Sequence, residues 1–276
     1  MRSYTTFYED TLLDVARDNS LGYTEMIAAN PGVDPWLPGE GTKVVLPTGH
    51  LLPNAPHKGL IINLGDQRLY FFPRGDEPPI SVPIGTGREG WNTPLGSTSV
   101  VRKQHRPTWY PGPAVRAEQP DLPRVVTPGP NNPLGEYAIY LGFPGYLVHG
   151  TNRPWGVGRR VSHGCIRLYP EDIAHLFDKI RVGTPVTIVD QKVKAGWVDG
   201  VLYLEAHPEP AQIFALEETG ALGLAPVDPI DDVTMELIRV TAGDAFSWVD
   251  WGLIKQTLSQ RSGTPVPIAN AEPSAD

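Results

Sequence analysis

The residue types that could do chemistry are concentrated in one segment of this 276-residue chain, residues 149–168, which reads HGTNRPWGVGRRVSHGCIRL. The segment contains Cys165, the only cysteine, and two of the seven histidines, His149 and His163. A thiol needs a base or a positively charged neighbour to become a reactive thiolate near neutral pH. We therefore predict that Cys165 is a nucleophile whose chemistry depends on the two histidines.

The residues beside Cys165 suit the transfer of an acyl group. A thiolate that attacks a carbonyl also needs donors for the oxyanion that forms. Gly164 allows the backbone to bend so that N–H groups can point into a cleft, and Ser162 supplies a hydroxyl for local hydrogen bonds. The segment is too polar and glycine-rich for a buried strand, whereas a merely structural cysteine more often lies among aliphatic residues.

Two other interpretations of these residues stay open. His149, His163 and Cys165 have the ligand types of a His₂Cys zinc site, although no carboxylate or second cysteine lies close in sequence to complete it. The other alternative is a structural cysteine with incidental histidines.

A second motif, GTGREG at residues 85–90, matches the spacing of dinucleotide-binding loops. That interpretation requires a strand before the motif and a helix that opens within it. Pro94 and Gly96 follow closely and block a long helix. We interpret the segment as a glycine-rich turn between strands and predict neither a nucleotide nor any other cofactor.

Composition narrows the class of protein. The net charge is −8, whereas a protein that reads nucleic acid usually has a basic surface. No apolar run approaches the roughly 18–20 residues of a membrane helix. The 29 glycines and 30 prolines favour short strands joined by many turns. We identify no signal peptide at the start, and one cysteine does not settle the compartment.

Short strands are therefore expected to position the chemical residues. Apolar or β-branched runs predict strands at residues 59–64, 68–72, 80–84, 97–102, 137–141, 146–149 and 185–189. One amphipathic helix should begin at Pro170 and end before Gly183, with a buried stripe that consists of Ile173, Leu176, Phe177 and Ile180. The long, proline-rich segment 106–132 is expected to be irregular and functional.

The N-terminal residues 1–50 have the predicted order strand, helix, helix, strand, with helices at 11–19 and 24–29 and a strand at 43–46. The stretches EDTLLDVARDN and NPGVDPWLPGEGTKVVLP resemble a LysM module, a small glycan-binding unit of cell-wall proteins. The alternative is a generic helical cap on the next domain. Residues 51–57 are expected to be a linker.

The C-terminal extension, residues 191–276, has no pattern that indicates a function. Asp199-Gly200 predicts a β-hairpin within residues 197–204, and residues 232–240 suggest a helix. The small, polar end, residues 263–276, is expected to be disordered. The extension is then either a structural addition or a regulatory or partner-binding segment.

The pair HGT at 149–151 and SHGCIR at 162–167 resembles the signature of the YkuD-type L,D-transpeptidases, and more closely that of the ErfK/YbiS/YcfS/YnhG group of Gram-negative bacteria. Supporting stretches are TPLG at 93–96, RPTW at 106–109 and GTPV at 183–186. The resemblance implies a mainly β protein with a β-sandwich catalytic domain at residues 58–190, preceded by the small α/β LysM-like module. It also implies an exported, periplasmic enzyme without a metal.

The resemblance further implies a reaction on peptidoglycan stem peptides. The cysteine attacks the carbonyl between the third residue and D-alanine, and a thioester acyl-enzyme remains after D-alanine leaves. An amine on a second stem, an outer-membrane lipoprotein or a free D-amino acid then accepts the acyl group. The partners would be stem peptides, glycan strands and an outer-membrane lipoprotein, with no nucleic acid and no membrane span. A hydrolase of the same family and a non-catalytic wall-binding protein are the alternatives.

Carried onto this sequence, the resemblance makes Cys165 the nucleophile and His149 the base, oriented by a backbone carbonyl. His163, if it lay in a strand, would share a face with Cys165 and help to hold the oxyanion or the loop. Backbone and oxyanion support is assigned to Gly164, Ser162 and Gly150, with N–H donors at Gly164 and Cys165. Arg167 would grip a substrate carboxylate or form a structural ion pair. Trp109 and Tyr146 would line the cleft or belong to the core.

Overall fold

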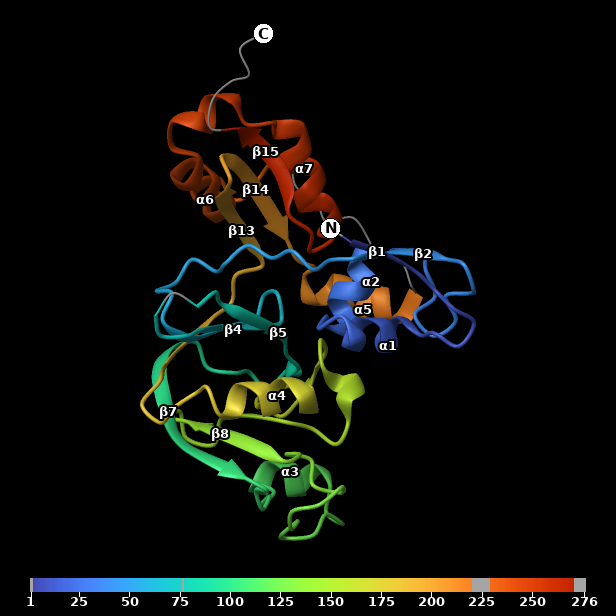
Figure 1. Ribbon diagram of the computed structural model, residues 1–276, viewed down its shortest axis with the longest axis vertical. Coiled ribbons are helices and arrows are strands. Elements are labelled where there is room, and N and C mark those ends of the chain that lie inside the picture. The colour runs from blue at the N-terminus through green and yellow to red at the C-terminus, as the bar shows by residue number, and fades with distance from the viewer. Residues whose placement is uncertain (1, 76, 220–228, 271–276) are drawn as a thin grey trace. The chain divides into compact units, whose positions relative to one another are not determined.

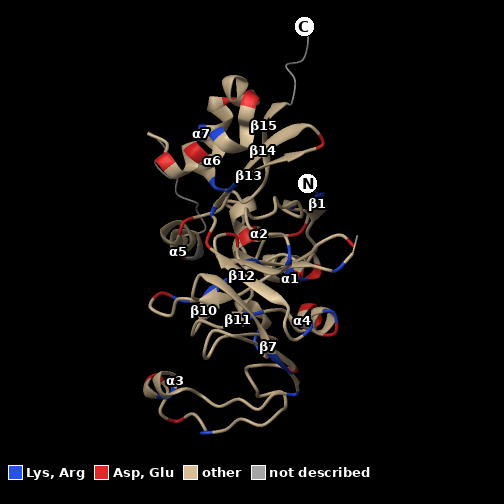
Figure 2. Cartoon of the chain, turned by 90° about the vertical axis from the view of Figure 1, so that its left-hand side faces the viewer, with Lys and Arg blue, Asp and Glu red and all other residues tan. Residues whose placement is uncertain are grey.

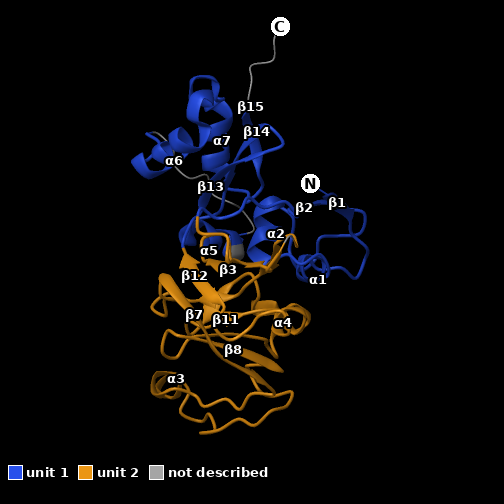
Figure 3. Cartoon of the chain, turned by 60° about the vertical axis from the view of Figure 1, so that its left-hand side comes forward, with its two compact units in different colours: residues 1–54, 190–276 blue, residues 55–189 orange. Residues whose placement is uncertain are grey.

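The computed structural model describes residues 2–75, 77–219 and 229–270. The chain forms two compact units, which are coloured separately in Figure 3. Unit 1 combines residues 1–54 with residues 190–276, and unit 2 consists of residues 55–189. The N-terminal segment and the C-terminal extension, which the sequence suggested as separate parts, therefore belong to one unit.

Unit 2 is built on an eight-stranded mixed sheet with the order β11-β9-β8-β7-β12-β3-β4-β5 (Figure 1). The predicted mainly β fold class is confirmed. The strands are β3 (Gly59–Asn63), β4 (Arg68–Phe72), β5 (Ile80–Pro83), β7 (Gly96–His105), β8 (Tyr137–Leu141), β9 (Leu147–His149), β11 (Ile166–Arg167) and β12 (Pro185–Val189).

The centre of this sheet is buried because its strands are apolar on both faces. Every residue of β3 is buried, and β3 pairs in parallel with β12, as near-continuous apolar strands do. Helix α4 (Pro170–Phe177) places Ile173 and Leu176 in the same core. The helix was predicted to extend to Ile180, which instead lies after its end but is still buried.

The sheet curls so that segments near its two edges meet. An isolated bridge joins Gly85, which follows β5, to Arg167 of β11 at the opposite edge. Beside it, β6 (Thr86–Gly87) pairs in parallel with β10 (Arg160–Ser162). A Cβ atom on Gly87 would lie 3.0 Å from the Gly164 Cα atom, so this glycine permits a close backbone approach. The GTGREG motif thus contributes to packing beside the SHGC segment.

The long segment between β7 and β8 is not wholly irregular, contrary to expectation. It contains a short helix, α3 (Pro113–Glu118), with Pro113 at the first helical turn. A bridge between Trp109 and Val126 closes the base of the segment. The buried Asn132 amide donates to the Pro107 carbonyl at 2.8 Å, which fixes the return to the sheet.

The start of unit 1 has the order strand, helix, helix, strand that its sequence predicts. The elements are β1 (Arg2–Thr5), α1 (Leu12–Asp18), α2 (Tyr23–Ala29) and β2 (Lys43–Leu46), and the two strands pair antiparallel. Thr11 caps α1 by accepting the Asp14 N–H. Leu216 of α5 (Pro210–Thr219) joins the core of this module, so the C-terminal extension completes it.

The rest of unit 1 is a second small core. It consists of β13 (Val193–Val198), β14 (Val201–Ala206), β15 (Val266–Asn270), α6 (Asp232–Ala242), the 3₁₀ helix η2 (Gly243–Trp248) and α7 (Trp251–Gln260). The predicted hairpin is confirmed, with positive φ angles at Asp199 and Gly200 in its turn, and so is the helix at α6.

The prediction of a disordered C-terminal end is wrong for residues 266–270. These residues form β15, which pairs with β14, and Ile268 is buried. Alternating apolar side chains give this strand a face that packs in the core, which the polar composition of the surrounding stretch obscures. Residues 271–276 lie outside the described part of the chain.

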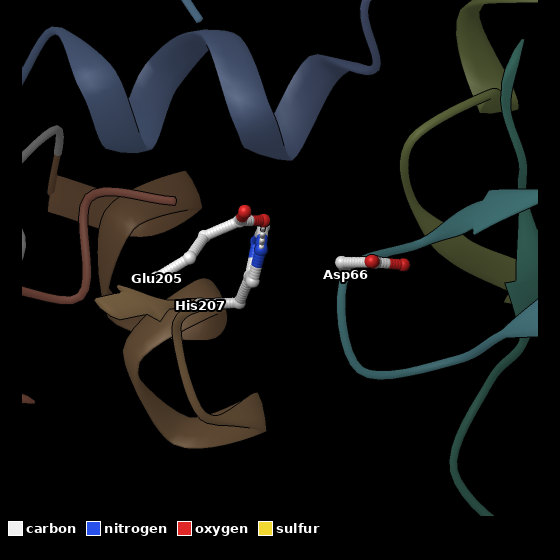
Figure 4. Close-up of side chains that lie close together, drawn as sticks. All are labelled: Asp66, Glu205 and His207. Carbon is white, nitrogen blue, oxygen red and sulfur yellow. Dashed lines mark hydrogen bonds and ion pairs between the residues drawn. The ribbon is translucent and has the colours of Figure 1, made fainter. Parts of the chain in front are cut away.

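A fully paired group of charges lies inside unit 1. The Glu205 carboxylate accepts from Lys194 Nζ at 2.7 Å and from His207 Nε2 at 2.6 Å, the latter shown in Figure 4. It also accepts the Leu51 N–H at 2.6 Å. All three side chains are buried, so each depends on these partners.

Within the described residues, no helix is long and apolar enough to cross a membrane.

Candidate active site

A cleft with a volume of about 620 Å³ lies in unit 2. Its walls come from β8, β9, the SHGC segment and the residues around α3. Of the site residues selected from the sequence, the structure places these around the cleft: Cys165, His149, His163, Ser162, Arg167 and Trp109. Tyr146, Gly150 and Gly164 lie within three positions of these residues in sequence but do not line the cleft.

The SHGC segment is a tight turn between β10 and β11. The buried Ser162 hydroxyl donates to the Cys165 carbonyl at 2.6 Å and accepts the Gly164 N–H at 3.1 Å. Thr93 donates to the Gly164 carbonyl at 2.8 Å. Gly164 has a φ of +96°, and a Cβ atom there would lie 3.0 Å from the Tyr146 ring. The turn therefore requires glycine, and Ser162 and Tyr146 hold its shape.

Cys165 lies at the end of this turn, partly exposed to the cleft. Burial raises the pKa of its thiol above the ordinary value, although a hydrogen bond from the Leu147 backbone and the charge of Arg167 act in the opposite direction. The thiol is consequently protonated at neutral pH in the resting protein. These two neighbours are nevertheless placed to stabilise a thiolate when one forms.

His149 ends β9 and is buried. Its Nδ1 lies 2.5 Å from the Gly150 carbonyl, to which it donates, so Nε2 is the nitrogen left to accept a proton. Burial, followed by the charge of Arg167, lowers the pKa of His149 to about 3. The imidazole is therefore neutral in the resting protein and has its accepting nitrogen free.

His163 lies in the turn and not in a strand, so the expected placement on one strand face with Cys165 is wrong. Its Nε2 lies 2.8 Å from the Glu118 carboxylate of α3 and 3.3 Å from Arg88 Nη2. Arg88 also pairs with Glu118, and the Trp91 ring meets the His163 ring edge-on at 4.6 Å. The hydrogen bond from His163 is the main cause of the lowered pKa of Glu118. We call Arg88, Glu118 and His163 the clasp.

Sequence reasoning missed both other members of the clasp. Arg88 lies in the GTGREG segment, which we interpreted only as a turn. Glu118 is 45 positions from His163 and has no local motif around it. The long insertion between two strands was the one available signal that the segment around Glu118 is functional.

Arg167 places a half-buried guanidinium in the cleft. Burial lowers its pKa, and Cys165 is the neighbour that raises it. In the described part of the chain, no carboxylate lies within ion-pair distance of it, and its buried Nε atom has no hydrogen-bond partner. The structural ion pair that we considered for Arg167 is thus not observed.

The geometry does not support the zinc alternative. A metal site requires its ligand atoms to converge on one point. Within the described residues, His149, His163 and Cys165 do not form a group whose ligand atoms all lie within 4.8 Å of one another. His149 and His163 are instead engaged with a backbone carbonyl and with the clasp.

The curled β domain has one cleft that contains a cysteine and a neutral histidine, which defines the protein as one with a thiol-containing site. Comparisons with known proteins identify its family. The model of the L,D-transpeptidase catalytic domain, YkuD, matches residues 57–188. The probable L,D-transpeptidase YbiS of Escherichia coli is 40% identical over 259 residues, which cover 92% of this chain and 81% of YbiS. The probable L,D-transpeptidase YcfS of Escherichia coli is 34% identical over 268 residues, with coverage of 92% and 79%.

A likeness of lower degree exists among solved structures. L,D-transpeptidase 1 of Mycobacterium tuberculosis is 23% identical in sequence, with a TM-score of 0.34. The match covers 48% of this chain and 61% of the chain of L,D-transpeptidase 1. The sequence relatives match along most of both chains. This chain therefore belongs to the YkuD L,D-transpeptidase family.

Proposed function

We propose that this protein is a periplasmic cysteine L,D-transpeptidase that acts on peptidoglycan stem peptides. Cys165 attacks the carbonyl between the third residue and D-alanine, D-alanine leaves, and a thioester remains on the sulfur. An amine then takes the acyl group. The observation that best supports this proposal is that one cleft holds a thiol, a neutral imidazole whose Nδ1 is bound to a backbone carbonyl, and Arg167, whose charge acts on both groups.

The protons can be followed through the acylation step. Because the resting thiol is protonated and His149 is neutral, the Cys165 proton passes to His149 Nε2 as the sulfur attacks. The Gly150 carbonyl keeps Nδ1 protonated and so stabilises the imidazolium. The imidazolium then donates its Nε2 proton to the nitrogen of the departing D-alanine. His149 is neutral again when the thioester has formed.

The oxyanion that forms during attack needs a donor close to the sulfur. Gly164 N–H already donates to Ser162, so the Cys165 N–H is the better donor of the two that we considered. Ser162 and Gly164 then act by holding the turn. His163 acts through the clasp, which ties the SHGC turn to α3.

Arg167 is proposed to bind a carboxylate of the donor stem. A half-buried guanidinium with an unpartnered Nε atom is a suitable site for such an anion. Trp109 supplies an apolar wall of the same cleft. Tyr146 is better explained as support for Gly164, against which its ring packs.

The acceptor is proposed to be an amine, on a second stem, a lipoprotein or a D-amino acid. The α3 segment lines the cleft and would limit access of water to the thioester. A hydrolase would share every residue described above and differ in that access alone. We further propose that residues 1–50 are a LysM-like module that contacts glycan strands.

Incubation with purified disaccharide-tetrapeptides, followed by mass spectrometry, tests the proposal. Released D-alanine together with a 3→3 dimer supports transpeptidation. Tripeptide without a dimer, also in the presence of lipoprotein peptide and D-amino acids, supports the hydrolase. Absence of D-alanine release from any stem peptide would refute the function, with Cys165→Ala as the blank.

A further inference from the structure

A second hollow in unit 2, with a volume of about 450 Å³, has four lysine and arginine residues in its lining. It lies where β3 and β12 begin and β4 ends, beside the segment that follows α4. Its cations are Lys58, Arg74, Lys179 and Arg181, and Glu77 is its one acidic lining residue in the described part of the chain. We call this site the basic hollow. It shares no residue with the cleft.

The four cations of the basic hollow are exposed and have no ion-pair partner among the described residues. Some cations elsewhere in the described residues are paired, such as the half-buried Lys192 with Asp190 at 3.3 Å and the exposed Arg239 with Glu236 at 2.6 Å. Four like charges around one hollow repel one another unless an anion enters. The chain has a net charge of −8, and its acidic and basic residues are coloured along the backbone in Figure 2. Four cations around one hollow are an exception to that overall balance.

The base of the basic hollow is firm and apolar. Phe71 is buried, and the His57 ring stacks on Phe72 with 4.8 Å between centroids and 5° between planes. Gly59 has a φ of +66°, and a Cβ atom there would lie 2.3 Å from the Pro185 carbonyl. The two strands therefore cannot move closer together at this point, and the long cationic side chains surround an apolar floor that is already formed.

We propose that the basic hollow binds carboxylate groups of the wall polymer at a point outside the cleft. This inference rests on the proposed function and extends it. A stem peptide presents carboxylates beside short apolar side chains, which matches cations around an apolar floor. A concave site fits a peptide better than it fits the flat surface of a bilayer. Neighbouring stems on one polymer would then add their contacts to those in the cleft.

The proposal predicts different effects on a polymer and on a small substrate. A soluble disaccharide-tetrapeptide occupies the cleft alone, whereas insoluble peptidoglycan can engage both sites. The test variant is Lys179→Glu/Arg181→Glu in the full chain. Its matched control is Arg239→Glu/Lys255→Glu, which makes the same change in net charge at exposed positions of α6 and α7.

Binding is measured by co-sedimentation with insoluble peptidoglycan in the Cys165→Ala background, at low salt and at about 0.15 M salt. We expect the test variant to bind about five- to tenfold more weakly at low salt, and the control to stay within about twofold of the parent chain. Amidation of the polymer carboxylates should remove the difference. With Cys165 intact, D-alanine release from the polymer should fall at least about fivefold more than release from the soluble substrate.

A second variant, Lys58→Gln/Arg74→Gln, keeps the test valid if the first does not fold, because it alters the two cations that come from other segments of the lining. Equal binding by both variants and the parent would overturn the proposal, as would a loss that amidation leaves unchanged. Binding to vesicles of anionic phospholipid is also measured. If the variants lose binding to vesicles but keep binding to the polymer, the site recognises a membrane surface and the proposal is overturned. If the protein releases no D-alanine but its binding to the polymer still depends on the basic hollow, the proposed enzymatic function is refuted and the proposed binding role of the hollow is supported.

Discussion

Two groups of buried titratable residues differ in how completely their polar atoms are paired. In unit 1, Glu205 accepts from Lys194, His207 and a backbone N–H, so its charge is matched. In the cleft of unit 2, the described residues provide no partner for the Arg167 Nε atom and no donor for the accepting nitrogen of His149. A buried charge with a complete set of partners is part of the folded structure, whereas polar atoms left unpaired in a cleft are candidates to bind a ligand or a proton. Mutations in each of the two groups test this difference in pairing.

The largest effect is expected at His149. His149→Ala removes the proposed proton acceptor, so acylation should slow by about 10²- to 10⁴-fold. His163→Ala should have a smaller effect, because its ring nitrogen is engaged with Glu118. Time-resolved mass spectrometry of Cys165 acylation by a carbapenem measures both rates. A larger loss at His163 would make that residue the base.

Glu205→Gln tests the matched group. Removal of one partner leaves Lys194 buried without its counter-charge, and the free energy of unfolding should fall by about 3–5 kcal/mol. Acylation of Cys165 in the fraction that stays folded should be unchanged, since this group lies in unit 1. Chemical denaturation measures the loss. A fully stable variant would show that the group is not structural.

Arg167→Gln should affect function more than stability. The guanidinium has no protein ion pair to lose among the described residues, but the thiolate and a substrate carboxylate lose a charge. We expect kcat/KM for the stem peptide to fall about tenfold to a hundredfold. Steady-state D-alanine release measures this, with thermal unfolding as the control. Unfolding without a change in kcat/KM would contradict the comparison.

Glu118→Gln should produce a smaller change. The neutral amide keeps the shape of the side chain but weakens the charged hydrogen bonds to His163 and Arg88. We expect acylation to slow by about three- to tenfold. Faster hydrolysis of the thioester should accompany this, if α3 limits access of water. If the lifetime of the acyl-enzyme is unchanged, the clasp has no role in keeping water away from the thioester.

The pH dependence of stability has a definite sign. The pKa of His149 is lowered from 6.5 to about 3, so the fold favours the neutral imidazole. Its contribution to stability is complete above pH 6.5 and is lost as the pH falls toward 3. His149→Gln should therefore lose less stability than the parent over this range. Urea denaturation at a series of pH values tests this, and identical pH profiles would contradict a buried neutral His149.

Much of the molecule could be predicted from local sequence. Strands such as β3 and β12 are short apolar runs between turn residues, and α4 has both a proline at its start and an apolar stripe. The error at β15 arose because a strand of five residues in a polar stretch is stabilised mainly by its pairing with β14. Composition does not record such a partner.

For the site, the sequence by itself determined the SHGC turn that carries the proposed nucleophile, because Ser162, Gly164 and Cys165 lie within one short segment and bond to one another. Only the tertiary structure decided what surrounds that turn. The packed sheet buries His149, and the register of β11 beside β9 places Arg167 next to it; burial first and this charge second lower the pKa of the imidazole. The chain between β7 and β8 brings Glu118 to His163 across 45 positions. Such contacts depend on strand order and on burial, which are properties of the folded sheet and not of any short segment.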